Sequence, residues 1–246
     1  MPFLFLSPST QEYNPYVTGG SEEYWMNLLA DALEPYLYAN TIAFVRNSPE
    51  MTAASSIAQA NGLGGFDFYL ALHSNASGEG QAGKNRGIIV FYYPTSSDGK
   101  RAAELFAAQL RQVYPLPARV TTQATTTLGE VRRPNYPANL IELGYHDNYD
   151  DARWIENNLD GAAQAIARGL TDYFGLPFLY PQYERTGIVT TEGSALRLRS
   201  YPGIDGEVIG SIPNGDSVRI YGSYQGWYSV GYGSQLGYAA QAYIAA

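Results

Sequence analysis

The sequence predicts an α/β domain with a mostly parallel sheet and helices on both faces, followed by a small all-β SH3-like barrel. Two observations carry this prediction. Up to about residue 174, short apolar runs alternate with segments of helical periodicity, which is typical of parallel strands joined by helices. From residue 186 onward, short strand-like segments are separated by Gly, Pro, Asn and Asp turns, and no segment has the length of a helix.

The elements of the first part can be placed in order along the chain. We expect strands at residues 3–6, 42–45, 66–72, 87–93 and 139–143, and helices at residues 22–37, 51–61, 99–113 and 159–174. Ser21 is the expected N-cap of the first long helix. The expected domains are residues 1–175, a linker at 176–185 that is rich in Pro, and residues 186–246.

Composition excludes several classes of function. The 246 residues carry a formal net charge of −8 and no basic run, so we expect no nucleic-acid partner. The chain has no cysteine, which excludes disulfides, thiolate-bound zinc and cysteine nucleophiles. No segment is long enough to insert into a membrane, and residues 1–7 lack the basic region and cleavage site of a signal peptide. We therefore expect synthesis in the cytoplasm, with any extracellular action following release.

Two ionisable residues occupy expected strand ends. His73 follows the apolar run that begins at Phe68, and Glu142 follows the run Ala138–Ile141. The carboxyl ends of strands in open α/β sheets are where ligands and catalytic groups collect. An imidazole is a good ligand for zinc, and a carboxylate beside it could act as acid/base. These two residues indicate a hydrolytic metal site.

Motifs along residues 3–174 resemble the zinc-dependent N-acetylmuramoyl-L-alanine amidases of bacterial cell-wall lysis. They are Leu6-Ser7-Pro8, Glu23 with Asn27-Leu28-Leu29-Ala30, Ala58–Asn61, Asp67–Ala76 around His73, Pro137–Asn148 around Glu142, and the final Gly169–Tyr173. The resemblance implies a zinc ion held by a His, a Glu and a second His, with a further Glu as catalytic acid/base. His73, Glu23 and Glu142 match the second His, the Glu ligand and the catalytic Glu.

The chain departs from this family at the first zinc-binding His. The loop after the first strand reads Ser7-Pro-Ser-Thr-Gln-Glu12 and has no histidine. Gln11 is the expected replacement ligand, Thr10 and Glu12 are alternatives, and His146 could supply a nitrogen instead. An amide oxygen is a weaker partner for Zn²⁺ than imidazole, so we expect a weaker zinc site or a different ion.

Other assignments near this site have competing interpretations. Glu23, in the first turn of a helix, could complement the helix dipole instead of binding a metal ion, and Glu22 fits that dipole role equally well. The spacing from Glu23 to Asn27 fits the family pattern and favours Glu23 as the ligand. His146 is expected to be a solvated loop residue. Arg132 and Asn75 are candidates for binding substrate, although a surface salt bridge explains Arg132 equally well.

The C-terminal segment resembles bacterial SH3 domains. The matching residues are Leu196–Pro202, Val208–Gly210, Gly226–Val230 and Leu236–Ile244. The resemblance implies that this domain holds the protein on peptidoglycan. Trp227 and Tyr243 could form the barrel core or a binding surface, since small barrels need large aromatic side chains to fill them.

The combined prediction is a metal-dependent hydrolase of the amide bond between N-acetylmuramic acid and L-alanine, acting on peptidoglycan as a phage lysin or as a released host enzyme. The missing first His favours an alternative, an inactive amidase fold that binds peptidoglycan. A third hypothesis is a zinc peptidase or deacetylase on the same scaffold.

Overall fold

The computed structural model describes residues 1–246. The chain divides into two compact units. One unit consists of Phe3–Leu33 and Phe44–Tyr173, and the other of Met1–Pro2, Glu34–Ala43 and Phe174–Ala246. The first helix therefore contributes residues to both units. None of the helices combines the length and the apolar character that crossing a membrane requires.

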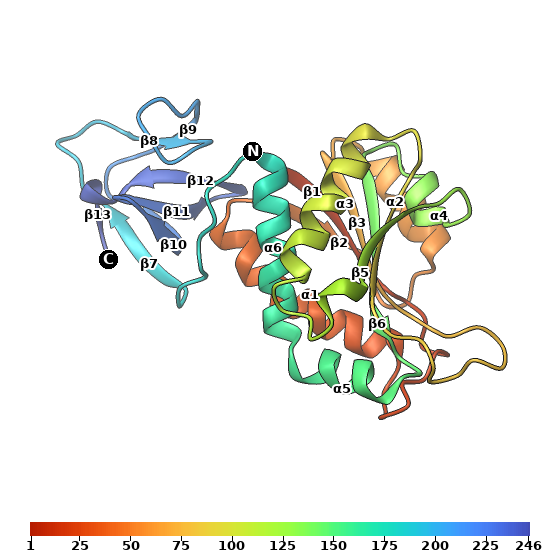
Figure 1. The fold of residues 1–246 in the computed structure, drawn as a ribbon. Coiled ribbons are helices and arrows are strands. Elements are labelled where there is room, and N and C mark those ends of the chain that lie inside the picture. The colour runs from red at the N-terminus through yellow and green to blue at the C-terminus, as the bar shows by residue number, and fades with distance from the viewer. The chain divides into compact units, whose positions relative to one another are not determined.

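The first unit is built on a six-stranded sheet in the order β2-β1-β3-β6-β4-β5 (Figure 1). Its strands are β1 (Phe3–Pro8), β2 (Ala43–Arg46), β3 (Phe68–Asn75), β4 (Ile88–Tyr92), β5 (Val120–Ala124) and β6 (Ala138–Tyr145). The β1–β3, β3–β6 and β4–β5 pairs are parallel, whereas β4 runs antiparallel to β6. The expected mostly parallel sheet is confirmed.

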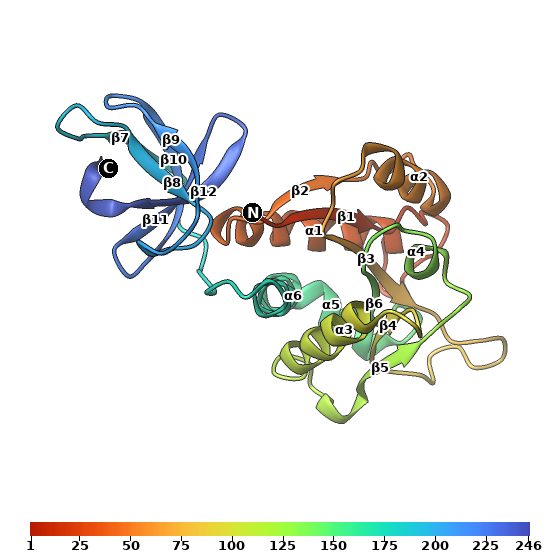
Figure 2. The same cartoon turned by 90° about the horizontal axis from the view of Figure 1, so that it is seen from above.

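Helices cover both faces of this sheet (Figures 1 and 2). They are α1 (Glu22–Ala39), α2 (Ala53–Leu63), α3 (Ser97–Leu110), α4 (Gly129–Arg132), α5 (Tyr149–Asn157) and α6 (Leu159–Phe174). On one face, Ile57 of α2 and Val131 of α4 share an apolar cluster with Phe5 and Tyr69 of the sheet. On the other face, the Phe68 ring lies 6.1 Å from that of Phe106 in α3.

Three elements of this unit were not indicated by the sequence patterns: β5, α4 and α5. In β5 only Val120 is buried, so the strand has no apolar alternation to recognise. Helix α4 is a single turn. Helix α5 is strongly polar, and it begins because the Asn148 side chain accepts hydrogen bonds from the backbone N–H groups of Asp150 and Asp151.

The second unit contains a seven-stranded sheet in the order β13-β7-β10-β11-β12-β8-β9, in which neighbouring strands are antiparallel. The strands are β7 (Arg185–Val189), β8 (Leu196–Arg199), β9 (Val208–Ile212), β10 (Ser217–Tyr224), β11 (Trp227–Tyr232), β12 (Gln235–Ala240) and β13 (Ile244–Ala245). Their inward side chains, among them Leu198, Ile220 and Val230, form one apolar cluster. This arrangement fits the expected SH3-like barrel.

The packing of α6 on α3 generates a prediction about two glycines of one helix. A Cβ atom at Gly169 would lie 2.4 Å from Cδ1 of Phe106 and 3.2 Å from its Cα, so the neighbouring helix would have to shift. We expect Gly169→Ala to lower the free energy of unfolding by about 1–3 kcal/mol. Denaturant titration followed by circular dichroism measures this change.

Gly161→Ala in the same helix is the matched control. Nothing lies within 4 Å of a Cβ at Gly161, so the substitution should be neutral or raise stability by up to about 1 kcal/mol through helix propensity. Equal unfolding midpoints for the two variants would contradict the close α3–α6 contact.

Candidate functional site

The polar residues of the first unit gather at the carboxyl ends of β1, β3 and β6. His73 in β3 and Glu142 in β6 are direct neighbours in the parallel register. Because side chains alternate along a strand, Tyr69 and His73 point to the same face of the sheet. Residue Ser7 of β1 also lies on that face, because its hydroxyl accepts a hydrogen bond from Tyr69 Oη at 3.0 Å. The strand ends therefore present several polar side chains to the face that α4 covers.

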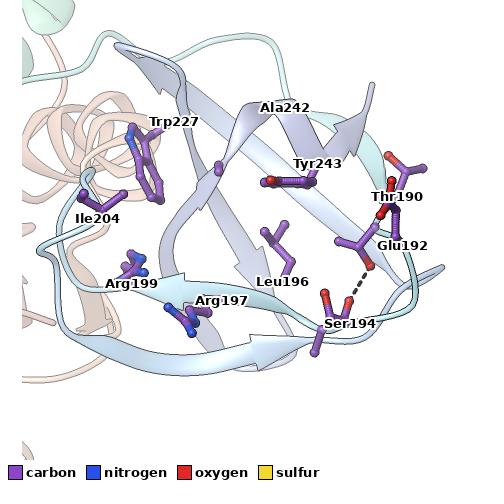
Figure 3. Close-up of a pocket in the computed structure, with 13 residues that line it drawn as sticks. Thr190, Glu192, Ser194, Leu196, Arg197, Arg199, Ile204, Trp227, Ala242 and Tyr243 are labelled. Atoms are coloured by element: carbon purple, nitrogen blue, oxygen red, sulfur yellow. Dashed lines mark hydrogen bonds between the residues drawn. The ribbon is translucent and has the colours of Figure 1, made fainter.

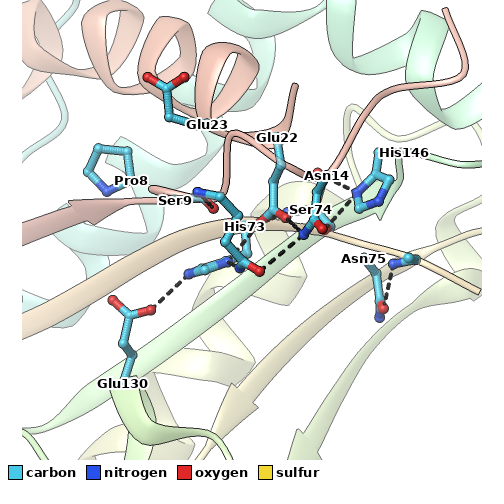
Figure 4. Close-up of polar contacts among 12 residues, drawn as sticks. Pro8, Ser9, Asn14, Glu22, Glu23, His73, Ser74, Asn75, Glu130 and His146 are labelled. Atoms are coloured by element: carbon cyan, nitrogen blue, oxygen red, sulfur yellow. Dashed lines mark hydrogen bonds and ion pairs between the residues drawn. The ribbon is translucent and has the colours of Figure 1, made fainter. Parts of the chain in front are cut away.

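The His73 imidazole lies between two buried carboxylates (Figure 4). Its Nδ1 atom is 2.7 Å from Oε1 of Glu22, the first residue of α1. Its Nε2 atom is 2.9 Å from Oε2 of Glu130 in α4. Each of the three residues exposes 6% of its surface or less, so this contact joins α1, β3 and α4 out of contact with bulk water.

The two carboxylates determine the charge of the imidazole. Burial alone would lower the pKa of His73, but the hydrogen bonds to Glu130 and Glu22 hold it well above its ordinary value. Burial likewise opposes ionisation of Glu22 and Glu130, and the contact with His73 outweighs it, so the pKa of each carboxyl is lowered. In the absence of a metal ion, the site holds an imidazolium between two carboxylates.

Glu130 is a site residue that sequence reasoning missed. Its Oε1 atom accepts hydrogen bonds from the Ser7 hydroxyl at 2.7 Å and from the Tyr69 hydroxyl at 2.8 Å. These bonds leave Oε2 directed at His73. The sequence carries no pattern for this residue, because a one-turn helix has no periodicity and only the fold brings Glu130 to His73.

The structure places Glu22, and not Glu23, against His73. The Glu23 side chain points away from the imidazole (Figure 4), and its Oε1 atom lies 3.5 Å from the Asn27 amide of its own helix. The sequence preference for Glu23 is therefore corrected: consecutive helix residues face different directions, and the loop before α1 sets which one faces the sheet. The second oxygen of Glu22 accepts a hydrogen bond from Asn14 at 2.7 Å.

Gln11, the expected stand-in for the missing His, does reach the site. Its Nε2 atom lies 3.3 Å from Nδ1 of His73. Its Oε1 atom accepts hydrogen bonds from Asn14 at 3.1 Å and from the Tyr13 hydroxyl at 3.3 Å. The alternatives Thr10 and Glu12 make no side-chain hydrogen bond to His73 or Glu22, and Glu12 is exposed.

His146 differs from its expected state. It is buried, and its ring stacks on Tyr16 with centroids 5.5 Å apart. Its Nδ1 atom lies 3.0 Å from the carbonyl oxygen of Ser74 and 3.1 Å from the Ser74 hydroxyl. The expectation of a solvated loop residue is wrong, because the chain after β6 folds back over the end of β3. His146 therefore contacts the end of β3 through Ser74 and forms no hydrogen bond with His73.

Glu142 has a different environment from the other two carboxylates. Its Oε2 atom is buried and has no hydrogen-bond partner. Burial raises the pKa of Glu142 to about 7, partly offset by the charge of His73 and reinforced by Glu22 and Glu130. A carboxylate with such a pKa can both accept and return a proton near neutral pH, which is what a general acid/base requires.

His73 and Glu22 offer two donor atoms of the kinds that zinc accepts, which is fewer than the three protein ligands of a usual catalytic zinc site. If the Nε2–H group of His73 donates to Glu130, the Nδ1 lone pair faces a Glu22 oxygen at 2.7 Å, and two acceptors this close need a proton or a cation between them. A histidine that donates its second nitrogen to a carboxylate is the usual support of a metal ligand. No three His, Asp or Glu residues form a metal-binding group, so the third protein ligand would be the Gln11 amide oxygen.

The two residues expected to bind substrate lie at different places. Arg132 ends α4, two residues after Glu130, and its side chain is exposed. Asn75 ends β3, and its Oδ1 atom accepts a hydrogen bond from the backbone N–H of Ala76 at 2.8 Å. Both lie close in the chain to site residues, and their substrate-binding roles remain predictions.

Comparisons with known proteins identify a family for each of the two parts of the chain. Residues 11–172 match the family model "N-acetylmuramoyl-L-alanine amidase", and residues 194–245 match the model "Bacterial SH3 domain". Bacteriocin BCN5 of Clostridium perfringens is 30% identical over 112 residues, which are 44% of this chain and 13% of that protein. The chain thus spans only a small part of the length of this relative.

Solved structures of amidases share the fold of the first unit. The N-acetylmuramoyl-L-alanine amidase AmiC2 of Nostoc punctiforme superposes with a TM-score of 0.62 at 18% identity, covering 71% of this chain and 97% of that one. Ami1 of Mycobacterium smegmatis gives 0.60 at 15% identity, with the same coverage of each chain. The catalytic domain of the CD27L endolysin, which targets Clostridia difficile, gives 0.56 at 19% identity and covers 70% of this chain and 97% of that one.

The contact between Glu22 and His73 generates a prediction about neighbouring residues. Glu22→Gln removes one of the two negative charges that pair with the buried imidazolium, and should lower the free energy of unfolding at pH 7 by about 3–5 kcal/mol. Glu23→Gln, one residue along the same helix turn, should change it by no more than about 0.5 kcal/mol. Denaturant titration of both variants tests the assignment, and a larger loss for Glu23→Gln would reverse it.

Proposed function

The chain belongs to the N-acetylmuramoyl-L-alanine amidase family, and from this premise we propose that it hydrolyses the amide bond between N-acetylmuramic acid and L-alanine in peptidoglycan. The observation that carries the proposal is the state of Glu142. A buried carboxylate oxygen without a partner is costly for folding, and here it lies beside an imidazole and two further carboxylates at the strand ends. Such a group is expected where proton transfer is the task.

Glu142 is proposed as the general base and then the general acid. As a carboxylate, it takes a proton from the water that attacks the amide carbonyl. It then returns this proton to the nitrogen of the leaving alanine, so that the amide C–N bond breaks and a free amine departs. A pKa of about 7 lets the same side chain perform both transfers at neutral pH.

We propose that His73, Glu22 and Gln11 hold a zinc ion in the active protein. A bound zinc ion supplies Lewis acidity and acidifies a water molecule. Glu130 would keep the His73 ring in its orientation and its Nε2–H occupied, which leaves Nδ1 free to act as the ligand. Gln11 would present its amide oxygen after rotation of the side-chain amide.

One observation favours a second candidate, an inactive amidase fold that binds peptidoglycan. Both nitrogens of His73 already lie within 2.9 Å of a carboxylate oxygen, so a proton can satisfy the site in place of a metal ion. In that state the imidazolium is neutralised and no Lewis acid is present. Metal content and wall hydrolysis, measured on one protein preparation, separate the two candidates.

The role of Glu142 predicts the behaviour of Glu142→Gln. Release of dye from labelled cell walls should fall by at least about 10²-fold, because the amide neither accepts nor returns the proton. Folding and wall binding should persist, since Gln has nearly the same shape and removes a buried unpaired charge. The matched control is Glu23→Gln, which should keep full activity because Glu23 points away from His73. Hydrolysis by Glu142→Gln at the wild-type rate would exclude Glu142 as the acid/base.

The proposed ligand set predicts the effect of restoring a third imidazole. Gln11→His should tighten zinc binding by at least about tenfold, because imidazole is a stronger ligand for zinc than an amide oxygen. Competition with a zinc chelator of known affinity measures this change. Removal of metal by excess chelator should abolish wall hydrolysis by the wild-type protein, and added zinc should restore it.

Glu12→His is the control for this experiment, because Glu12 is the exposed neighbour of Gln11 and makes no contact with His73. It should leave zinc affinity at the wild-type value. A wild-type protein that binds no zinc and releases no dye, yet sediments with cell walls, would establish the second candidate.

A further inference from the structure

The loop between β1 and α1 carries a chain of side-chain contacts that ends at the His73 imidazole. Asn14 lies in this loop, and its backbone carbonyl oxygen accepts a hydrogen bond from the N–H group of Glu22 at 2.9 Å. Its side chain lies beside the Glu22 carboxylate (Figure 4), with Nδ2 at 2.7 Å from Oε2. Asn14 is therefore fixed to the start of α1 through both its backbone and its side chain.

The Glu22 carboxylate determines which end of the Asn14 amide faces it. As the partner of the His73 imidazolium, Glu22 is an ionised carboxylate, and such a group only accepts hydrogen bonds. The part of Asn14 that faces Oε2 of Glu22 must be the NH2 group, because an amide oxygen there would place two acceptors 2.7 Å apart. This NH2 group has a second hydrogen, which it donates to Oε1 of Gln11 at 3.1 Å.

The orientation of the Gln11 amide follows from that of Asn14. The NH2 group of Asn14 needs an acceptor, so the oxygen of Gln11 faces it, and the Tyr13 hydroxyl donates to the same oxygen at 3.3 Å. Gln11 then presents its NH2 group to His73, with Nε2 at 3.3 Å from Nδ1. Both of these nitrogens are donors when the ring is an imidazolium, so the contact with His73 does not orient the amide. Asn14 and Tyr13 do.

This orientation opposes the use of Gln11 as a metal ligand. A metal ion binds the oxygen of an amide, whereas the NH2 group offers only donor hydrogens. To bring its oxygen to the His73 side, the Gln11 amide must turn end for end, which places its NH2 group against that of Asn14. Asn14 cannot turn in response, because its own oxygen would then face the Glu22 carboxylate. Turning Gln11 therefore costs the hydrogen bonds from both Asn14 and Tyr13.

We propose that Asn14 and Tyr13 are positioning residues that hold Gln11 with its NH2 group toward His73, and that they thereby weaken zinc binding at this site. The inference rests on the ligand set proposed above, in which Gln11 supplies the third protein ligand. Two properties of Gln11 then act against zinc. An amide oxygen is a weaker ligand than an imidazole, and this oxygen is already engaged by two donors.

The first test measures the zinc affinity of the full chain by competition with a chelator. Tyr13→Phe removes one of the two donors to Oε1 of Gln11, and should tighten zinc binding by about two- to tenfold, the range for loss of one neutral hydrogen bond. Tyr13 exposes 74% of its surface, so this variant should fold like the wild-type protein. In the Gln11→His background no amide remains to be turned, and Tyr13→Phe should not tighten zinc binding there.

Two other exposed tyrosines provide matched controls. Tyr24 lies in α1, and Tyr243 lines a surface groove of the second unit (Figure 3). Tyr24→Phe and Tyr243→Phe should leave zinc affinity at the wild-type value, because neither hydroxyl donates to Gln11. Unchanged zinc affinity of Tyr13→Phe would overturn the proposal. Equal tightening by Tyr13→Phe in the wild-type and Gln11→His backgrounds would also overturn it, because the hydroxyl would then act without the amide.

The second test observes the Gln11 amide by nuclear magnetic resonance in the isotope-labelled, metal-free full chain. The NH2 protons of Gln11 should show a nuclear Overhauser effect to Hε1 of His73, since Nε2 of Gln11 lies 3.3 Å from the ring nitrogen next to that proton. NH2 protons that contact the Tyr13 ring and not His73 would show the opposite orientation and overturn the proposal.

These measurements separate the inference from the proposed function. A wild-type protein that binds zinc and responds to Tyr13→Phe as expected, but cleaves no cell walls, would retain the inference and lose the proposed hydrolysis. If neither the wild-type protein nor the variants bind zinc while the contact between the Gln11 NH2 protons and His73 is present, the proposed metal site fails. The assignment of Asn14 and Tyr13 as the residues that orient Gln11 would then be supported.

Discussion

The contact of one buried imidazole with two buried carboxylates organises the first unit. Glu22 begins α1, His73 lies two residues before the end of β3 and Glu130 lies in the single turn of α4, so three separate segments meet at one ring. Compared with apolar residues of similar size, a buried ion pair of this kind adds little to the stability of the protein. Loss of one partner strongly destabilises the protein, because the other charge stays buried without a partner. The main effect of this contact is therefore to fix the orientation of the His73 ring. The ring can satisfy both carboxylates in only one orientation, and that orientation directs Nδ1 toward the loop that carries Gln11.

The three carboxylates around His73 divide into two kinds. Glu22 and Glu130 have lowered pKa values, because the hydrogen bonds to His73 outweigh the effect of burial. Glu142 has a raised pKa, because its Oε2 atom is buried without such a bond. When the surroundings of two carboxyl groups shift their pKa values in opposite directions, one group can bind a ligand while the other transfers a proton. This difference in pKa explains why Glu142 is the acid/base candidate, whereas Glu22 and Glu130 hold the His73 ring.

The sequence predicted those parts of this site that a local pattern of apolar and polar residues marks. His73 and Glu142 end apolar runs, and parallel strands bring such ends together; the structure pairs them in register. Glu130 was missed because its position depends on a one-turn helix that only tertiary packing defines. Glu23 was preferred to Glu22 because the sequence does not show which of two adjacent residues at the start of a helix points toward the sheet. Burial of His146 depends on how the chain folds back after β6, which no local pattern encodes.

The loss of the family's first histidine changes what the surrounding residues must do. With Gln11 in its place, a proton on His73 supplies the positive charge opposite Glu22 and Glu130. In the proposed zinc site, the ion would supply that charge instead. Under this proposal, proton and zinc would compete for Nδ1, and zinc would have to displace a proton that two carboxylates stabilise. This competition would lower the apparent affinity for zinc as the pH falls, and the weak amide ligand would lower it further.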